Sequence, residues 1–389
     1  MKLNGFKNAN IYLQDRGIKK ACLSINGERI SSLSSYLKEE DEGYLSLPDS
    51  LFVVPGFIDE HVHGARNADA RDGKEESLKT IADAEAKEGT TSFNFTTRTR
   101  DKTHIVSALK AISSYRDNQT GRSRARGVHL EGPFISPAYC GAQNKEDIVP
   151  LDVKLLDEYN ALTNYRIKEV TFSYDPRHKD FLTYRKEHRI APALGHSDNT
   201  CALAREAIGE GVTIGTHTFN ARRGIGHRER GTAGALRISD SVSCELICDF
   251  HHVCKECIER MFRCKGKDRI TLITDSREAK DREDGVYHLG GQKVYVKDGA
   301  ARLESGKLAG SLLNRNVAIR NRKNLLSLSR EEAVDRASRN PAKNRGLYNK
   351  IGSIKEGKMA DFAIVDKDRN VYRTIVSGKI VYWKEGNSL

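Results

Sequence analysis

Short apolar runs alternate with amphipathic stretches through the middle of this chain. The runs that predict strands cover residues 51–58, 91–95, 128–130, 170–172, 191–194, 212–214, 243–248 and 270–273. Residues 77–88 and 104–115 have the apolar spacing of helices. Strands that alternate with helices are typical of a parallel sheet with right-handed crossovers. About eight such units predict an α/β protein built on a (β/α)8 barrel of the TIM type.

The two ends of the chain have a different pattern, in which short strands are separated by polar turns. Residues 21–25 precede an Asn26-Gly27 turn, and residues 361–365 and 374–383 have the pattern of strands and a hairpin. We expect both ends to pair in a small β-sandwich domain, made of residues 1–50 and 345–389. Residues 51–344 would then form the barrel domain.

The composition is that of a globular protein. Of 389 residues, 38% are hydrophobic and 30% are charged. This supplies enough apolar side chain for a core and excludes a disordered or fibrous chain. No run approaches the roughly 18 apolar residues of a membrane span, and residues 1–17 lack the apolar stretch of a signal peptide. We therefore expect a cytoplasmic protein without membrane contact.

Basic residues outnumber acidic ones, 65 to 53, for a net charge of +12. Such an excess fits a nucleic-acid partner, a small anionic substrate or a solvated basic surface. The basic residues are spread along the chain, aromatic residues make up only 7%, and no RNA-stacking motif is present. We expect a basic surface with an anionic metabolite and no nucleic-acid partner.

Three of the eight cysteines are close together, with Cys254 and Cys257 in a C-x-x-C pair and Cys264 seven residues later. A structural zinc site usually needs a second pair, which is missing at the expected spacing. The alternative is a helix with reduced thiols buried on one face, and this alternative is favoured.

Polar residues follow five of the predicted strands, where a barrel enzyme carries its chemistry. They are His61, His63, Glu131, His196, His217 and Asp275. His61 and His63 are two apart in an extended segment, so both imidazoles can reach one metal ion. Each residue has an ordinary alternative role, such as a structural histidine or, for Asp275, a helix N-cap.

Together these residues form a nitrogen and oxygen ligand set suited to Zn²⁺, Fe²⁺ or Mn²⁺. A bound metal ion lowers the pKa of its water toward about 7. Asp275 could take that proton and pass it to a leaving amine. The pattern predicts metal-assisted hydrolysis.

Several sequence blocks carry a family resemblance. Residues 53–64, VVPGFIDEHVHG, resemble the opening signature of the amidohydrolase superfamily, and residues 352–361 resemble its counterpart near the other end. The blocks HLEGPFI (129–135), GHS (195–197), THTFNA (216–221) and HRE (227–229) are similar to the branch of that superfamily that deacetylates N-acetylglucosamine 6-phosphate. This resemblance implies hydrolysis of the acetamide to acetate and glucosamine 6-phosphate.

The same resemblance implies roles for single residues. Glu131, His196 and His217 would hold the principal divalent metal ion, and His61 with His63 a second one found in some members, so that one or two ions bind per chain. Asp275 matches the catalytic acid and base and can also bind metal. His252 matches the histidine that polarises the acetamide carbonyl.

The resemblance also implies a substrate site shared between two subunits. Arg228 matches an arginine that reaches the sugar phosphate from the neighbouring subunit of a homodimer, and an Arg fork suits a phosphate. The further substrate contacts implied are Ala142, Gln143, Asn220, Ala221, Asp249, Phe250, His251, His252, Leu308, Ala309 and Gly310.

The chain departs from this family at positions near the substrate. Arg222, Arg277 and Arg315 replace the usual methionines, Arg223 lies in an altered loop, and Gln143 replaces a histidine. In one interpretation the arginine side chains extend to solvent and leave the site intact. In the other they change specificity or weaken activity. The alternative functions are therefore deacetylation of the galactosamine epimer or another N-acyl compound, or sugar-phosphate binding without efficient turnover.

Overall fold

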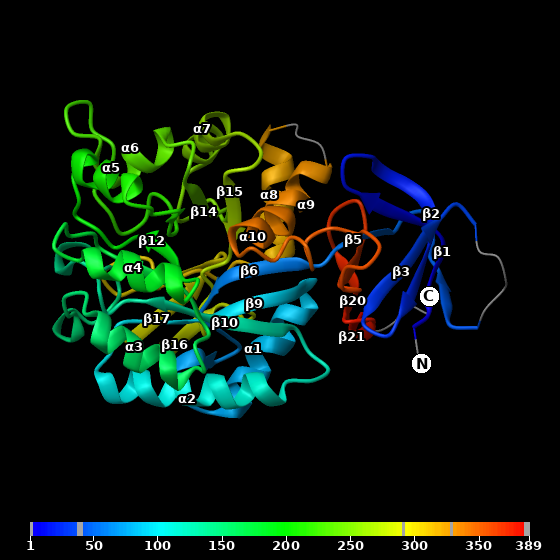
Figure 1. Ribbon diagram of the computed structural model, residues 1–389, viewed down its shortest axis with the longest axis horizontal. Coiled ribbons are helices and arrows are strands. Elements are labelled where there is room, and N and C mark those ends of the chain that lie inside the picture. Colours follow the sequence, from blue (N-terminus) through cyan, green and yellow to red (C-terminus); the bar gives the residue numbers. More distant parts are fainter. Residues whose placement is uncertain (1–2, 37–41, 290–291, 327–329, 385–389) are drawn as a thin grey trace.

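The computed structural model describes residues 3–36, 42–289, 292–326 and 330–384 (Figure 1). At its centre eight parallel strands follow one another in chain order around a barrel. These strands are β6 (Phe57–Val62), β9 (Thr90–Thr97), β10 (Arg124–Glu131), β11 (Ile167–Phe172), β12 (Ala191–Leu194), β13 (Ile214–Gly215), β14 (Ser243–Ile247) and β15 (Ile270–Ile273). The predicted (β/α)8 barrel is confirmed.

The first and last barrel strands meet at their carboxyl ends. Val62 and Ser276 form a parallel bridge. The backbone N–H of Asp275 also donates to the carbonyl of His61, at 3.0 Å. This closure holds the segment after β15 against the segment that carries the two neighbouring histidines.

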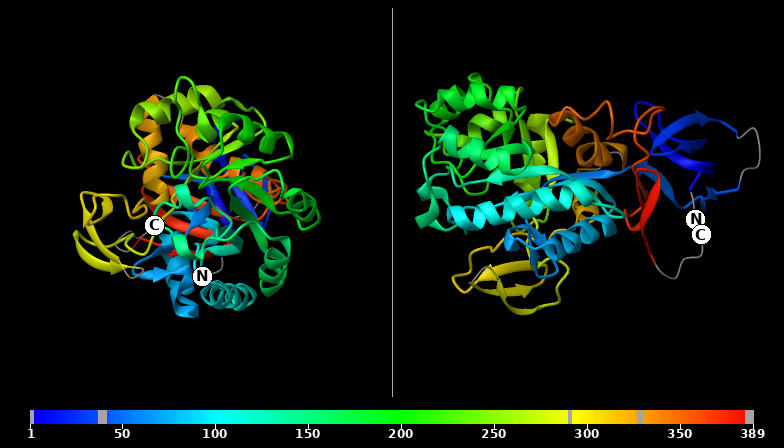
Figure 2. Two further views of the ribbon diagram at one scale, coloured as in Figure 1. Left: turned by 90° about the vertical axis from the view of Figure 1, so that its left-hand side faces the viewer. Right: turned by 60° about the horizontal axis from the view of Figure 1, so that its bottom comes forward.

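Helices surround the barrel (Figures 1 and 2), and buried apolar residues of several of them belong to the same core cluster as those of the strands. The helices are α1 (Glu75–Lys87), α2 (Lys102–Asn118), α3 (Val153–Leu162), α4 (Lys179–Glu187), α5 (Cys201–Gly209), α6 (Gly231–Ile238), α7 (Lys255–Lys265), α8 (Arg315–Leu326), α9 (Arg330–Ala337) and α10 (Arg339–Asn344). In α1, Leu78, Ile81 and Ala82 are buried, and the spacing of three and four residues places them on one face. The helix predicted over residues 77–88 corresponds to α1, and the helix predicted over residues 104–115 lies within α2.

The two chain ends form one eight-stranded sheet beside the barrel (Figure 1). Its strands are β1 (Gly5–Leu13), β2 (Gly17–Asn26), β3 (Arg29–Ser34), β4 (Tyr44–Ser46), β5 (Phe52–Pro55), β19 (Phe362–Val365), β20 (Val371–Val376) and β21 (Lys379–Trp383). β5 pairs with both β1 and β19, so it joins the N-terminal and C-terminal parts. Phe6 and Phe362 pack edge to face in the core of this sheet, with ring centroids 5.6 Å apart.

The strand expected over residues 51–58 is divided in two. β5 belongs to the outer sheet and β6 to the barrel, and Gly56 lies between them. A Cβ atom on Gly56 would lie 2.2 Å from Oγ1 of Thr91, so a larger residue would collide with β9. Close approach of the two segments therefore requires glycine here.

Two small sheets were not predicted. β7 (Gly64–Ala65) pairs with β8 (Ala68–Asp69), and a three-stranded antiparallel sheet contains β16 (Gly285–Leu289), β17 (Gln292–Lys297) and β18 (Ala300–Leu303). This second sheet projects from the side of the barrel (Figure 2). No helix in the described ranges is long and apolar enough to span a membrane.

All eight cysteines are free thiols. The prediction that α7 buries its thiols on one face is wrong, because Cys254 and Cys264 are exposed and Cys257 is half-buried. Ile258, Met261 and Phe262 fill that face instead.

Candidate active site

The six residues predicted as metal ligands lie at the carboxyl end of the barrel. His61 and His63 come at the end of β6, Glu131 ends β10, and His196, His217 and Asp275 follow β12, β13 and β15. The carboxyl ends of parallel strands share one face of a barrel, so residues far apart in the chain meet there. The histidines and Glu131 are at most 5% exposed, whereas the Asp275 side chain is 15% exposed. Asp275 is thus the member most open to solvent.

One group consists of Glu131, His196 and His217. Oε1 of Glu131 lies 3.1 Å from Nε2 of His196 and 2.9 Å from Nε2 of His217. The two imidazole nitrogens are 3.1 Å apart. His196 and His217 have φ angles of +44° and +27°, values that are uncommon outside glycine and frequent at functional sites.

A second group consists of His61, His63 and Asp275. Nε2 of His63 lies 3.2 Å from Nε2 of His61 and 3.2 Å from Oδ1 of Asp275. Glu131 reaches this group too, with Oε1 3.5 Å from His61 and Oε2 3.4 Å from His63. Glu131 therefore lies between the two groups and can contact an ion in either.

The orientation of the imidazoles fits a divalent cation. Nδ1 of His63 contacts the carbonyl of Thr96 at 3.1 Å, and Nδ1 of His196 contacts the carbonyl of Tyr139 at 2.8 Å. A carbonyl only accepts, so Nδ1 must donate, and in the neutral ring Nε2 then has a lone pair. Lone pairs that converge with carboxylate oxygens are the donor set of Zn²⁺ and related ions.

The charges in the cluster also favour a cation. Burial raises the pKa of Glu131, but His196 and His61 outweigh it and lower the pKa well below its usual range. Burial likewise opposes the ionised form of Asp275, yet His61 and His63 lower the pKa of this carboxyl. At His61 burial lowers the pKa, but Asp275 and the other carboxylates raise it to about 10. A proton on His61 partly neutralises these carboxylates, and a metal ion would compete with it.

Gln143 lies against the first group. Its Nε2 donates to Oε2 of Glu131 at 2.9 Å and lies 3.3 Å from Nε2 of His196. The backbone N–H of Thr99 donates to its Oε1 at 2.7 Å, which fixes the amide orientation. Gln143 thus donates a hydrogen bond but cannot carry a proton.

His252 forms a tight pair with Asp249 after β14. Nδ1 of His252 is 2.5 Å from Oδ2 of Asp249, and its backbone N–H donates to Oδ1 at 2.8 Å. Burial lowers the pKa of His252, but Asp249 and Asp275 together raise it above its ordinary value. An imidazolium held in this way can donate to a carbonyl oxygen.

The structure gives backbone contacts for some of the other predicted substrate residues and the burial of several more. The N–H of Asn220 donates to the carbonyl of His217 at 3.0 Å, and Ala221 accepts from Ser197 at 3.2 Å, so both adjoin the first group. Ser311, directly after the predicted contacts 308–310, donates to the carbonyl of Asp275 at 3.3 Å. Ala142, Phe250 and Ala309 are partly or fully buried, whereas His251 and Arg228 are exposed. Arg228 lies in the loop before α6.

The expectation that the replacing arginines extend to solvent is wrong for three of them. Arg222, Arg277 and Arg315 are 4%, 9% and 0% exposed. Arg222 donates to carbonyls at the ends of β12 and β13, and Arg315 to carbonyls of β15 and β6. Only Arg223 is partly open, where it pairs with Asp198 at 2.7 Å.

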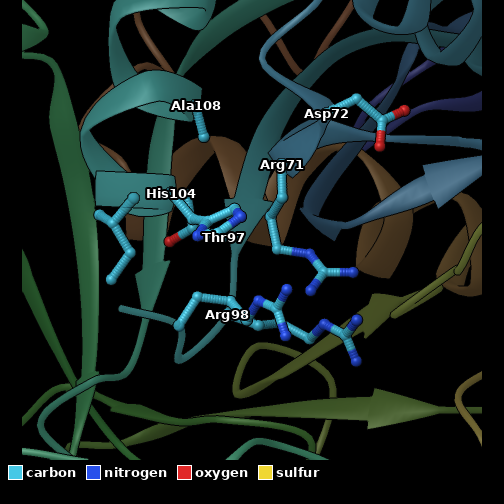
Figure 3. Close-up of a pocket in the computed structure, with 8 residues that line it drawn as sticks. Arg71, Asp72, Thr97, Arg98, His104 and Ala108 are labelled. Carbon is cyan, nitrogen blue, oxygen red and sulfur yellow. The ribbon is translucent and has the colours of Figure 1, made fainter. Parts of the chain in front are cut away.

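A cavity lined by several arginines lies next to the carboxyl end of β9. Its volume is about 260 Å³, and Arg71, Arg98, Arg100 and His104 are among its lining residues. The side chains of Arg71 and Arg98 extend from different segments into the same space (Figure 3). Arg71 has a bidentate partner in Asp69, at 2.8 and 2.6 Å, whereas the carboxylate oxygen nearest Arg98 among the described residues is 3.9 Å away.

Two buried residues near the ligands were missed by sequence reasoning. Glu245 lies inside β14, with Oε2 3.3 Å from Nδ1 of His61. The His129 ring packs edge to face on His61, with centroids 4.4 Å apart. The available signal was a glutamate in the middle of the apolar run 243–248, since a buried carboxylate needs a partner.

The comparisons with known proteins agree with this geometry. The amidohydrolase family matches residues 52–381. The N-acetylglucosamine-6-phosphate deacetylase of Lysinibacillus sphaericus is 36% identical over 330 residues, covering 85% of each chain. The enzyme of the same name from Bacillus subtilis (strain 168) is 35% identical over 381 residues, covering 97% of this chain and 96% of its own.

A solved structure extends the similarity to three dimensions. The N-acetylglucosamine-6-phosphate deacetylase of Thermotoga maritima has a TM-score of 0.87 and 30% identity, over 98% of this chain and 100% of its own. The similarity therefore includes both the barrel and the outer sheet.

Proposed function

Because the chain belongs to the amidohydrolase family, we propose that it hydrolyses the acetamide of N-acetylglucosamine 6-phosphate. The products are acetate and glucosamine 6-phosphate. The observation that carries this proposal is the convergence of four imidazoles and two carboxylates at the carboxyl end of the barrel. We infer the substrate from the similarity of the chain to N-acetylglucosamine-6-phosphate deacetylases.

A divalent metal ion belongs to this chemistry. Glu131, His196 and His217 would hold the principal ion, and His61, His63 and Asp275 a second one, with Glu131 reaching both. The ion is Zn²⁺, Fe²⁺ or Mn²⁺, which suit such ligands. When bound, it polarises the acetamide carbonyl and makes water a stronger nucleophile near neutral pH.

Two residues of the chain act on the reacting atoms. Asp275 accepts a proton from the attacking water and delivers it to the amide nitrogen as the C–N bond breaks. Its low pKa keeps the carboxylate ionised before the attack. His252, charged beside Asp249, donates a hydrogen bond to the carbonyl oxygen as negative charge develops there.

The phosphate is bound at the rim of the site. Arg228 is exposed and has the forked geometry that suits a phosphate. In a homodimer it would reach the phosphate held by the other subunit. Asn220 and Ala221 line the sugar phosphate beside His217. We place the active dimer in the cytoplasm. The small β-domain predicted over residues 1–50 and 345–389 is extended by β5 (Phe52–Pro55), which pairs with β1 and β19.

Acetate release is the direct test. Purified protein of known metal content should release acetate from N-acetylglucosamine 6-phosphate, and prior chelation should abolish that release. The galactosamine epimer and an unphosphorylated sugar serve as comparison substrates. Faster acetate release from the galactosamine epimer would make that sugar the preferred substrate. If metal-replete protein released no acetate from either sugar phosphate, the proposed deacetylation would be refuted.

A further inference from the structure

Glu245 occupies an unusual place in the barrel. It lies in the middle of β14, between Cys244 and Leu246, and is 1% exposed. A carboxylate buried at this depth is costly unless another group compensates its charge. Its contacts therefore indicate what it does.

The Glu245 carboxylate contacts one residue of each metal group. Oε2 lies 3.3 Å from Nδ1 of His61 and accepts from the backbone N–H of His217, also at 3.3 Å. The other oxygen, Oε1, has no hydrogen-bond partner in the described part of the chain. Glu245 thus lies behind the ligands, on the side away from Asp275.

The two nitrogens of His61 have different partners. Nδ1 contacts Glu245, whereas Nε2 faces His63 at 3.2 Å and Asp275 at 3.6 Å. An ionised carboxylate can only accept, so the hydrogen bond to Glu245 places a proton on Nδ1. In the neutral ring Nε2 then presents its lone pair to the cation.

Among the four imidazoles of the predicted ligands, only that of His61 has a carboxylate as the partner of its Nδ1 within the described structure. Nδ1 of His63 and of His196 contacts a neutral carbonyl, and Nδ1 of His217 has no partner there. The His129 ring, which packs edge to face on His61, contacts the hydroxyl of Thr171 through Nε2 at 2.7 Å.

We infer that Glu245 is a positioning residue for the second metal ion. It fixes the tautomer and orientation of His61 and makes Nε2 a stronger donor toward the ion shared with His63 and Asp275. Carboxylate partners of this kind typically change metal affinity about 10–100-fold. The inference rests on the metal role proposed above for His61.

The test is equilibrium dialysis of the chelator-stripped full chain against Zn²⁺ or Mn²⁺, with bound metal counted at each free concentration. Glu245→Gln keeps the shape of the side chain but removes its charge. This variant should lower the affinity for the second ion about 10–100-fold and leave the affinity for the principal ion nearly unchanged. His61→Asn should remove the second ion.

Glu169→Gln is the matched control, because Glu169 is equally buried but contacts Arg345 and His129 rather than a predicted ligand. It should keep both affinities. Circular dichroism and thermal unfolding verify that each variant folds, and Glu245→Asp replaces Glu245→Gln should the latter fail to fold. One outcome would overturn the inference about Glu245 but keep the proposed role of His61. In that outcome His61→Asn loses the second ion, whereas the Glu245 variant binds both ions with unchanged affinity. If His61→Asn also leaves metal binding unchanged, both the inference and the proposed role of His61 fail.

Discussion

Replacing Arg98 by methionine should stabilise the protein. Arg98 follows β9 and is 7% exposed. The only carboxylate oxygen within 4 Å of its guanidinium in the described structure is that of Asp69, at 3.9 Å, and its Nε has no hydrogen-bond partner there. Burial, with Arg277 and Arg71 nearby, lowers the pKa of Arg98 to about 9.

The size of the effect follows from this pKa. Lowering it from 12.5 to about 9 corresponds to roughly 5 kcal/mol of unfavourable free energy for the charged side chain. Replacing buried charges by apolar side chains typically gains about 1–4 kcal/mol. We expect Arg98→Met to raise the free energy of unfolding by about 2–4 kcal/mol. At about 2 cal/mol/K of unfolding entropy per residue, this raises Tm by about 3–5 °C.

The pH dependence gives a second signature. The folded state binds the Arg98 proton less tightly than the unfolded state, so the destabilising contribution of Arg98 decreases as the pH rises past about 9. The methionine variant lacks this group. Its advantage should therefore shrink by about 1 kcal/mol between pH 7 and pH 10.

Urea denaturation of both proteins at the two pH values is the assay. Arg71→Met is the control. It makes the same substitution in the same cavity, but at an arginine that is paired with Asp69. It should lower stability, since Asp69 would lose its bidentate partner. An Arg98→Met variant that is less stable than wild type, or whose advantage grows with pH, would refute the reasoning.

Three further changes test other parts of the molecule. Asp275→Asn should lower acetate release about 10²–10⁴-fold with metal content at Glu131 retained, and undiminished turnover would remove Asp275 from proton transfer. Arg228→Ala should raise KM for the phosphorylated sugar about 10–100-fold, as expected for a lost charge-assisted hydrogen bond, but not for the unphosphorylated one; equal effects would argue against a phosphate contact. Lys280→Met should lower the free energy of unfolding by about 3–5 kcal/mol, because Lys280 is buried with carboxylate oxygens of Glu85 and Glu88 at 2.9 and 2.6 Å. Urea denaturation measures this loss, and a variant as stable as wild type would contradict it.

The positions of the ligands could be predicted because each polar residue comes directly after an apolar run. In a barrel that order is enough to place His61, His196 and Asp275 on one face, since every strand ends there. Glu245 could not be placed in this way, because it lies within its strand and faces the interior behind His61. Its role depends on a distance between β14 and β6 that neither strand reveals alone.

The buried arginines show a second limit of sequence reasoning. An arginine among apolar positions suggests a side chain that reaches water, yet Arg222 and Arg315 remain inside. Each donates to carbonyls from two neighbouring strands, β12 with β13 and β15 with β6. Within the described residues, neither guanidinium contacts a predicted metal ligand, so we expect their effect on barrel stability rather than on the chemistry of the site.

Methionine is the natural comparison for these buried positions. It is unbranched and long, and it fills such space without a charge to desolvate. The chain has only three methionines, whereas Arg98, Arg222 and Arg315 occupy the interior with exposed fractions of 7%, 4% and 0%. Arg222 and Arg315 recover part of the desolvation cost through strand carbonyls, which would lose those hydrogen bonds on replacement. Arg98 has no such bonds within the described residues, and for this reason it is the position where methionine should stabilise most.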